Sequence, residues 1–261
     1  MGFFDAAKGA ISGNKAYKLH TDANKLAGEG KPAEAEEKYQ EALRLYEEAA
    51  SLGNMPQKIY QGYAVLLLRM GKFDRARDLM VDMSRMKNLT DDDWFQLRLH
   101  YSIYQWRMGE LDKAIDTIGR AAAYKMNGVI YSTLGMYWVD KARQTGDFQP
   151  ALDFNLKALD YDDEDAATLD NMGQLYEAMS EVEGDGEKAK ECRAKALDFY
   201  EKAHAQKARQ ITTLYCLARM LHQDGKDDRA RKLLSVRDSL YYSAICPVDR
   251  QMMDELAAEI G

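Results

Sequence analysis

The four histidines are the residues of this 261-residue chain most able to carry acid–base or metal chemistry near neutral pH. They stand far apart, at His20, His100, His204 and His222, and no two follow the His-x-x-x-His spacing that puts two imidazoles on one helix face. The chain also lacks a Gly-x-x-x-x-Gly-Lys-Ser/Thr phosphate loop and a Gly-x-Ser-x-Gly nucleophile turn. We therefore expect no catalytic residues, no metal site and no cofactor, and a protein that is not an enzyme.

Cysteines and acidic runs also fail to form a reactive constellation. Cys192, Cys216 and Cys246 are too few and too widely spaced for a disulfide framework or a Cys-x-x-Cys metal knuckle. The acids at 91–93 suit the start of a helix, where they meet the positive end of the helix dipole. Residues 160–165 contain five acids but lack the Asp-x-Asp-x-Asp-Gly order of a calcium loop. These acids are interpreted as solvated turn and helix-start residues.

Charge is unevenly distributed along the chain. The net charge is −7, whereas a protein that binds phosphate backbones usually carries a basic excess, so the balance argues against nucleic acid as the main partner. Residues 160–191 hold 12 acids and two lysines, a balance of −10, and residues 192–237 hold 11 basic and five acidic residues, a balance of +6. Two interpretations remain open: the blocks attract each other, or they form a polarised surface for a partner.

A repeat of about 40 residues must position these side chains. Six glycines each follow one apolar helical segment and precede another, with separations of 41, 38, 37, 40 and 39 residues: Gly30, Gly71, Gly109, Gly146, Gly186 and Gly225. Glycine suits such a turn because a helix commonly ends on a left-handed residue. The repeat therefore predicts six helix–turn–helix units.

Small and large apolar residues recur at fixed distances from these glycines. Five residues on stand Ala35, Ala76, Ala114, Ala151 and Ala230. Nine and twelve residues on stand Tyr39, Met80, Ile118 and Leu234, and Ala42, Met83, Ala121 and Ala158. Offsets of 5, 9 and 12 differ by four and three, so these positions share one helical face. In the fifth unit Glu191 replaces the alanine, which makes that unit the least regular.

The predicted elements are almost all helices, because prolines number only four and good helix formers abound. We expect more than about 70% helix and no sheet. First helices are predicted near 14–28, 55–70, 91–108, 128–145, 164–182 and 209–224. Second helices are predicted near 32–51, 73–86, 111–124, 148–160, 187–207 and 227–243. Pro247 is expected to open a last helix, whose Met252, Met253, Leu256 and Ile260 would cover the end of the array.

Three stretches carry a resemblance to a known family. Residues 131–138 read Tyr-Ser-Thr-Leu-Gly-Met-Tyr-Trp, 169–176 read Leu-Asp-Asn-Met-Gly-Gln-Leu-Tyr, and 30–35 read Gly-Lys-Pro-Ala-Glu-Ala, continuing to Tyr39 and Ala42. They resemble the two halves of the tetratricopeptide repeat (TPR), although the period exceeds the family's usual 34 or so. The resemblance implies an all-α, right-handed α-solenoid of about six TPR-like helix pairs with a C-terminal capping helix.

The resemblance also implies an organisation for the whole chain. Residues 1–13 would be an N-terminal amphipathic segment, 14–246 the TPR-like repeat array and 247–261 the capping helix. An apolar stripe of Phe3, Phe4, Ala7 and Ile11 marks the first segment. We expect this segment to fold onto the first repeat, and an interfacial or partner-binding helix remains the alternative.

In the TPR family the first helices line the concave surface and ligands contact a defined set of repeat positions. Carried over to this chain, the resemblance gives a peptide-binding groove of Tyr17, His20, Asn24, Lys58, Gln61, Gln96, His100, Trp106, Thr133, Asp170, Asn171, Gln174, Glu177, Tyr215 and Arg219. We expect the acids Asp170 and Glu177 to be exposed and to pair with Lys or Arg of a partner, with an apolar anchor toward Trp106.

These expectations together indicate a cytoplasmic scaffold or adaptor that binds a protein or peptide partner in the concave groove. The alternative is a co-chaperone or a ligand-sensing regulatory protein. The chain has no run of about 20 apolar residues that would span a membrane, and homo-oligomerisation stays open. In the TPR clamp for acidic chaperone tails, five positions hold Lys, Asn, Asn, Lys and Arg. Here they are His20, Asn24, Gly62, Gln96 and His100, so we expect no such clamp.

Overall fold

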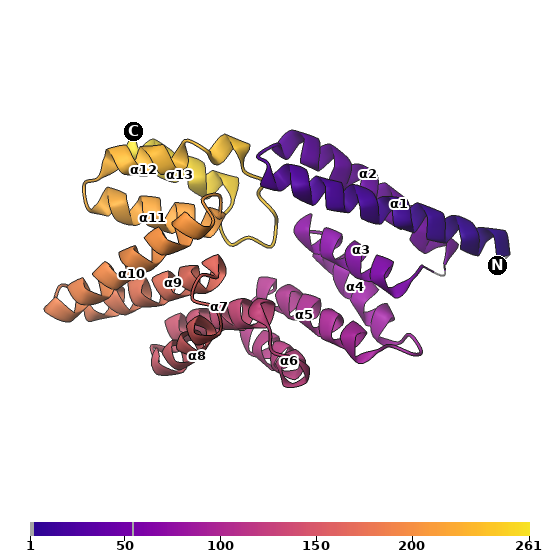
Figure 1. Cartoon of the computed structure of the whole chain (residues 1–261), viewed down its shortest axis with the longest axis horizontal. Helices are drawn as coiled ribbons and strands as arrows, with labels where there is room; N and C mark the ends of the chain where they lie inside the picture. Colours follow the sequence, from indigo (N-terminus) through magenta and orange to yellow (C-terminus); the bar gives the residue numbers. More distant parts are fainter. Residues whose placement is uncertain (1–2, 54) are drawn as a thin grey trace. The chain divides into compact units, whose positions relative to one another are not determined.

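The structure is a computed structural model that describes residues 3–53 and 55–261, with side chains described from residue 7 onward. About 80% of the chain is helical, and the described residues contain no strand, which confirms the all-α prediction. In the part of the chain that the structure describes, six helix pairs follow one another, and a short 3-10 turn and a last helix come after them (Figure 1). The helices are α1 Phe3–Gly28, α2 Pro32–Leu52, α3 Gln57–Arg69, α4 Phe73–Ser84, α5 Asp91–Arg107, α6 Leu111–Tyr124, α7 Gly128–Thr145, α8 Gln149–Tyr161, α9 Ala166–Glu183, α10 Glu187–Gln206, α11 Ile211–Gln223, α12 Asp227–Leu234 and α13 Arg250–Ile260.

A short turn separates the two helices of each pair, as Figure 1 shows for α11 and α12, and each turn contains a glycine. Gly30, Gly71, Gly109, Gly146 and Gly225 all have φ between 69° and 81°, the left-handed region that costs glycine least. At Gly146 the backbone N–H donates to the carbonyl of Ala142, which satisfies one of the last carbonyls of α7. These five repeat turns are therefore where the sequence places them.

In the fifth pair the turn glycine differs from the predicted one. Gly186 has an extended backbone and precedes α10, whereas Gly184 has φ of 71° and ends α9. Counted from Gly184, the alanines five and twelve residues on are Ala189 and Ala196, and both are buried. The exposed Glu191 is therefore not a substitute for the packing alanine. The unit keeps the repeat's face with its reference glycine two residues earlier.

The faces predicted from the offsets form the core. Ala35, Ala76, Ala114, Ala151 and Ala230, together with Tyr39, Met80, Ile118 and Leu234, are at most 1% exposed, and Ala189 of the fifth pair is 4% exposed. The pairs approach closely where the first helix offers a glycine: a Cβ on Gly173 would lie 2.6 Å from the ring of Tyr200. Burial of such rings and aliphatic side chains is the main favourable term in folding.

The chain divides into two compact units. Unit 1 holds the described residues up to Tyr104 together with Asp238–Ile245, and unit 2 holds Gln105–Arg237 together with Cys246–Gly261. The sequence indicated one array over 14–246 with no linker. In the structure the residues of this array fall into the two units, and a late segment of the chain belongs to the first of them.

That late segment, Asp238–Ile245, replaces the second half of a predicted helix. The prediction of a helix over 227–243 is wrong beyond Leu234, where α12 ends and irregular backbone follows a short 3-10 turn. Tyr241 packs on the ring of Tyr39 at 4.9 Å and donates a hydrogen bond to Glu36 at 2.9 Å. The N–H of Ala244 donates to the carbonyl of Arg69 at the end of α3. These unit 1 contacts offset the helical hydrogen bonds that the segment forgoes.

Both ends of the chain depart from the predicted boundaries. The last helix begins at Arg250 rather than at Pro247, because the Asp249 side chain caps it by accepting from the N–H of Met252 at 2.9 Å. Met253, Leu256 and Ile260 are buried against α11 and α12, as expected of the cap, and Met252 is half-buried.

At the other end α1 begins at Phe3 instead of near residue 14. Gly9 lies against the end of α2, and Gly13 lies between α2 and α3, where a Cβ on Gly13 would meet Ile59 of α3 at 2.8 Å. Ile11 is 70% exposed, and the side chains of Phe3 and Phe4 lie outside those described. None of the helices in the described part of the chain has an apolar stretch that could cross a bilayer.

Candidate functional site

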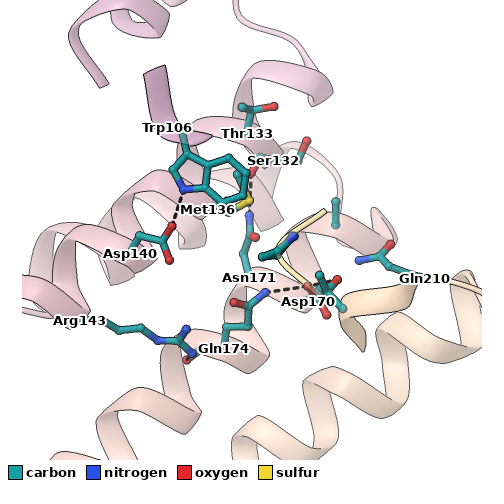
Figure 2. A pocket seen from close by; sticks show the side chains of 13 residues that line it. Trp106, Ser132, Thr133, Met136, Asp140, Arg143, Asp170, Asn171, Gln174 and Gln210 are labelled. Atoms are coloured by element: carbon teal, nitrogen blue, oxygen red, sulfur yellow. Dashed lines mark hydrogen bonds between the residues drawn. The ribbon is translucent and has the colours of Figure 1, made fainter. Parts of the chain in front are cut away.

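A pocket of about 290 Å³ opens in unit 2 on the first helices of successive pairs. We call it the α7–α9 pocket (Figure 2). Its lining comes from α5, α7, α9 and α11 and from two residues outside helices: Trp106, Ser132, Thr133, Met136, Asp140, Arg143, Ala167, Asp170, Asn171, Gln174, Thr212, Gln210 and Pro247. Five residues of the expected groove therefore meet in one cavity, namely Trp106, Thr133, Asp170, Asn171 and Gln174.

Trp106 and Asp140 form one wall of the pocket. The indole Nε1–H donates to Asp140 Oδ2 at 2.7 Å, so the orientation of the ring is fixed by a charge-assisted bond (Figure 2). Burial raises the pKa of Asp140, although the Trp106 hydrogen bond and the Arg143 charge both act to lower it. The wall presents a flat apolar ring with a carboxylate beside it.

Asp170 lies at the base of the opposite wall and is only 3% exposed. Its carboxylate accepts hydrogen bonds from Thr213 at 2.6 Å, Gln174 at 2.8 Å and Thr212 at 2.9 Å. Burial raises the pKa of Asp170, and these three hydrogen bonds act in the opposite direction. The expectation of an exposed acid is wrong here, because Asp170 uses its lone pairs to tie α9 to α11.

Asn171 also works partly within the fold. Its side-chain amide donates to the backbone carbonyl of Ser132 at 2.8 Å and so joins α9 to α7. Thr133 and Met136, in contrast, are half-buried and make no side-chain hydrogen bond among the described residues. A ligand would therefore find the Thr133 hydroxyl, the Met136 thioether and the Trp106 ring most available.

Glu177, Arg219 and Tyr215 form a separate cluster outside the α7–α9 pocket. Glu177 is 3% exposed and accepts from Arg219 Nη2 and from the Tyr200 hydroxyl, each at 2.8 Å. The Arg219 guanidinium lies 5.4 Å from the centre of the Tyr215 ring. Glu177 is therefore not the exposed acid that the sequence suggested, since its charge is neutralised within unit 2.

In unit 1 the expected groove residues also connect first helices to one another. The Lys58 ammonium of α3 lies 4.7 Å from the centre of the Tyr17 ring of α1. Gln61 donates to Asp93 of α5 at 3.0 Å. These contacts place successive first helices side by side within unit 1, as the repeat register predicts.

The remaining unit 1 residues are largely committed to the fold. His20 is 5% exposed between the rings of Tyr39 and Tyr46, and burial, assisted by the Arg69 charge, lowers its pKa to about 4. Asn24 accepts from the Tyr39 hydroxyl at 2.7 Å. Burial lowers the pKa of His100 to about 4, and Gln96 is half-buried on the same helix. His20 and His100 are therefore neutral at neutral pH.

Sequence reasoning missed several lining residues of the α7–α9 pocket. Ser132 precedes the expected Thr133 on α7, and Arg143 lies about three turns after Ser132 on the same helix, so the helical period could have added both. Gln210 and Thr212 lie at and just after the start of α11, one turn before the expected positions there. No sequence pattern predicts that Pro247 lines the pocket, because it follows an irregular segment whose path the repeat does not specify. Among the residues that the structure describes, no three His, Cys, Asp or Glu side chains cluster as metal ligands would.

Comparison with known proteins bears on the fold and the repeat. Residues 33–98 match the tetratricopeptide repeat family model, and no curated protein matches the chain. The human IFIT1 dimer with m7Gppp-AAAA is similar with a TM-score of 0.59 and 18% identity, over 84% of this chain and 48% of that one. The Cut9 hetero-tetramer with Hcn1 of the APC/C is similar with a TM-score of 0.59 and 18% identity, over 98% and 48%. The chain thus spans about half the length of these solved chains, and the likeness concerns the fold alone.

Proposed function

We propose that this chain, which belongs to the tetratricopeptide repeat family, is a scaffold or adaptor. In this role it holds a peptide segment of a partner protein. The binding site we propose is the α7–α9 pocket. The observation that carries the proposal is the meeting of Trp106, Thr133 and Asn171, from three successive first helices, around one cavity. Repeat arrays bind extended partners on such surfaces, since each unit adds side chains to a continuous face.

The chemistry of the lining supports a peptide ligand. An apolar side chain of the partner would stack on Trp106 and Met136, and its backbone polar groups would face Thr133 and the uncommitted edges of Gln174 and Gln210. Arg143 is the only Lys or Arg among the lining residues, so the pocket does not offer the dense positive charge that a phosphate backbone requires. A bound nucleic acid, as in the IFIT1 structures, is therefore the less favoured ligand.

The co-chaperone alternative has little support. A clamp for an acidic C-terminus needs cations that pair with carboxylates, and the corresponding positions include His20 and His100. With each pKa lowered to about 4 by burial, both imidazoles are neutral at neutral pH. We expect a peptide ending in Glu-Glu-Val-Asp to show no binding at micromolar concentration in fluorescence anisotropy.

The proposal is tested with the full chain as bait in extracts of its native host. Met136→Arg places a long cation in the α7–α9 pocket, and Leu156→Arg is the matched control, an apolar-to-Arg change at a residue that is 44% exposed on α8. We expect a partner that co-purifies with the wild type and with Leu156→Arg, and whose recovery falls at least about tenfold with Met136→Arg, the cost of a blocked anchor site.

Circular dichroism and thermal unfolding must first show that both variants fold like the wild type. A set of co-purifying proteins that is the same for the wild type, Met136→Arg and Leu156→Arg would place the binding surface elsewhere on the molecule.

A further inference from the structure

A second pocket in unit 2 shares no residue with the first. It measures about 530 Å³ and lies between the end of α10, the start of α11 and α12, and we call it the α10–α12 pocket. Its volume falls within the roughly 300–1,000 Å³ of sites that enclose a ligand group. The pocket occurs in the basic block of residues 192–237, a feature of the sequence that the proposed function leaves unused.

The floor of the α10–α12 pocket is apolar. Leu214 of α11 is buried beneath it, Leu233 and Val236 are half-buried, and Ala208 is exposed at its edge. α12 is short and points Ala230 and Leu234 into the core, so Leu233 faces the pocket instead. An apolar side chain of a ligand would remove this surface from water, which is favourable in proportion to the area covered.

The rim of the pocket is basic. Arg229 and Lys232 stand three residues apart on one face of α12, both exposed, and Arg209 adds a third cation. Arg229 pairs with Glu201 at 2.6 Å, the one acid in the lining. Within the described part of the chain, no carboxylate lies at ion-pair distance from Lys232. The rim therefore keeps a positive excess above an apolar floor.

We propose that the α10–α12 pocket docks an acidic segment of a partner protein, which inserts an apolar side chain onto the floor and sets its carboxylates against Arg229 and Lys232. Charge complementarity selects an acidic ligand, and the apolar floor selects one with a hydrophobic anchor. A nucleic acid would satisfy the rim but leave the floor without a partner. The two pockets share no lining residue, so this proposal does not rest on the peptide site proposed at the α7–α9 pocket.

The first test uses a fluorescein-labelled peptide, Glu-Asp-Leu-Glu-Asp-Leu-Glu-Asp, and the full chain in fluorescence anisotropy. Two control peptides separate the two contributions, one with Gln and Asn in place of the acids and one with Ser in place of Leu. We expect each control to bind at least about fivefold more weakly, because exposed ion pairs and one buried apolar side chain each contribute around that factor. Binding of the acidic peptide should also weaken as salt is raised.

The second test changes the pocket. Arg229→Gln with Lys232→Gln removes two rim cations, and Lys125→Gln with Lys157→Gln removes two exposed lysines elsewhere in unit 2. Ala208→Asp places a negative charge at the exposed edge of the floor and needs no buried rearrangement, so it keeps the test valid if the double variant is unstable. We expect the first double variant and Ala208→Asp each to weaken peptide binding at least about fivefold, and the lysine control to leave it unchanged.

Several results would overturn the proposal. One is equal affinity for the acidic and the amide peptide, and another is equal weakening by the rim and control lysine variants. A single-stranded oligoadenylate that displaces the peptide at lower concentration would identify a nucleic-acid surface. Self-association that the rim variant abolishes, measured by sedimentation, would identify a second copy of this chain as the occupant.

Discussion

At the scale of single residues, several ionisable side chains that were expected on a binding surface are buried. His20, Asp170 and Glu177 were expected on a binding surface, yet each is at most 5% exposed and bonded within the fold. Because these side chains are buried, a ligand in the α7–α9 pocket would contact neutral side chains such as Thr133 and Met136 instead. It also makes stability depend on pH and on charge partners, because the folded state holds these groups in one protonation state.

His20 gives a prediction for acid stability. The folded-state pKa, about 4, is below the ordinary value of 6.5, so between these values the unfolded chain binds more protons and the free energy of unfolding falls as pH falls. Between pH 7.5 and 5 this group alone should remove about 2 kcal/mol. Urea unfolding of His20→Gln at both pH values should show a loss smaller by that amount. An identical pH dependence in the variant would mean that His20 titrates normally.

Arg219 gives a prediction for the buried ion pair with Glu177. Arg219→Met leaves a carboxylate that is 3% exposed without its cation, and we expect a loss of about 3 kcal/mol in urea unfolding. Glu177→Gln in the same background should restore most of it, since the neutral amide oxygen can still accept from the Tyr200 hydroxyl. Arg120→Met removes an exposed helix pair with Asp116 and should cost less than about 0.5 kcal/mol. Equal losses at both arginines would contradict the buried pair.

At the scale of the elements, close helix approach depends on residues without side-chain bulk. Gly173 of α9 lies under the Tyr200 ring of α10, and Gly135 of α7 lies against Asn155 of α8. Both glycines come from the stretches that resemble the TPR first helix. Although the repeat of this chain is longer than the usual TPR repeat, the two helices of these pairs are in close contact at a glycine.

Two glycine substitutions separate packing from helix propensity. Gly173→Ala puts a methyl group 2.6 Å from the Tyr200 ring, and we expect it to lower the free energy of unfolding by about 1–3 kcal/mol. In α6 a Cβ on Gly119 would meet no atom within 4 Å, so Gly119→Ala should stabilise by about 0.5–1 kcal/mol. Thermal unfolding of both variants gives the comparison. Stabilisation by both changes would show that α9 and α10 are not in close contact.

At the scale of the whole molecule, the segment Asp238–Ile245 completes unit 1 although it follows α12 in the chain. Its Tyr241 hydroxyl donates to Glu36, and burial, with the Glu36 interactions, raises the pKa of Tyr241. Removing this ring should therefore loosen the start of α2 and the end of α3, elements more than 160 residues earlier in the chain.

Tyr241→Ala tests this dependence by hydrogen exchange. We expect faster exchange at the start of α2 and the end of α3, and a loss of about 2 kcal/mol in unit 1, because a half-buried ring and one hydrogen bond are removed. Tyr161→Ala is the control, since that ring is 54% exposed on α8. Unchanged protection around Glu36 and Arg69 would show that unit 1 is complete without the segment.

Periodicity by itself determined most of the helices, the turn glycines of five of the six pairs and the core faces. Offsets of 5, 9 and 12 from a turn glycine specify one helical face, and a face of alanines and large apolar residues has only its partner helix to pack on. The same register placed Trp106, Thr133 and Asn171 on successive first helices, which is enough to predict that they share a surface.

Tertiary structure alone decided which of these residues a ligand could reach. Whether Asp170 faces solvent or Thr213 depends on a helix 43 residues later, and no local pattern records that distance. The same limit applies to Tyr241 and Pro247, which lie after the last regular repeat, where packing on earlier helices replaces periodicity. Helix periodicity and turn residues depend on neighbouring residues in the chain, so the sequence pattern predicts them. Burial between distant segments depends on how both segments pack, so it is decided by the free energy of the whole folded state.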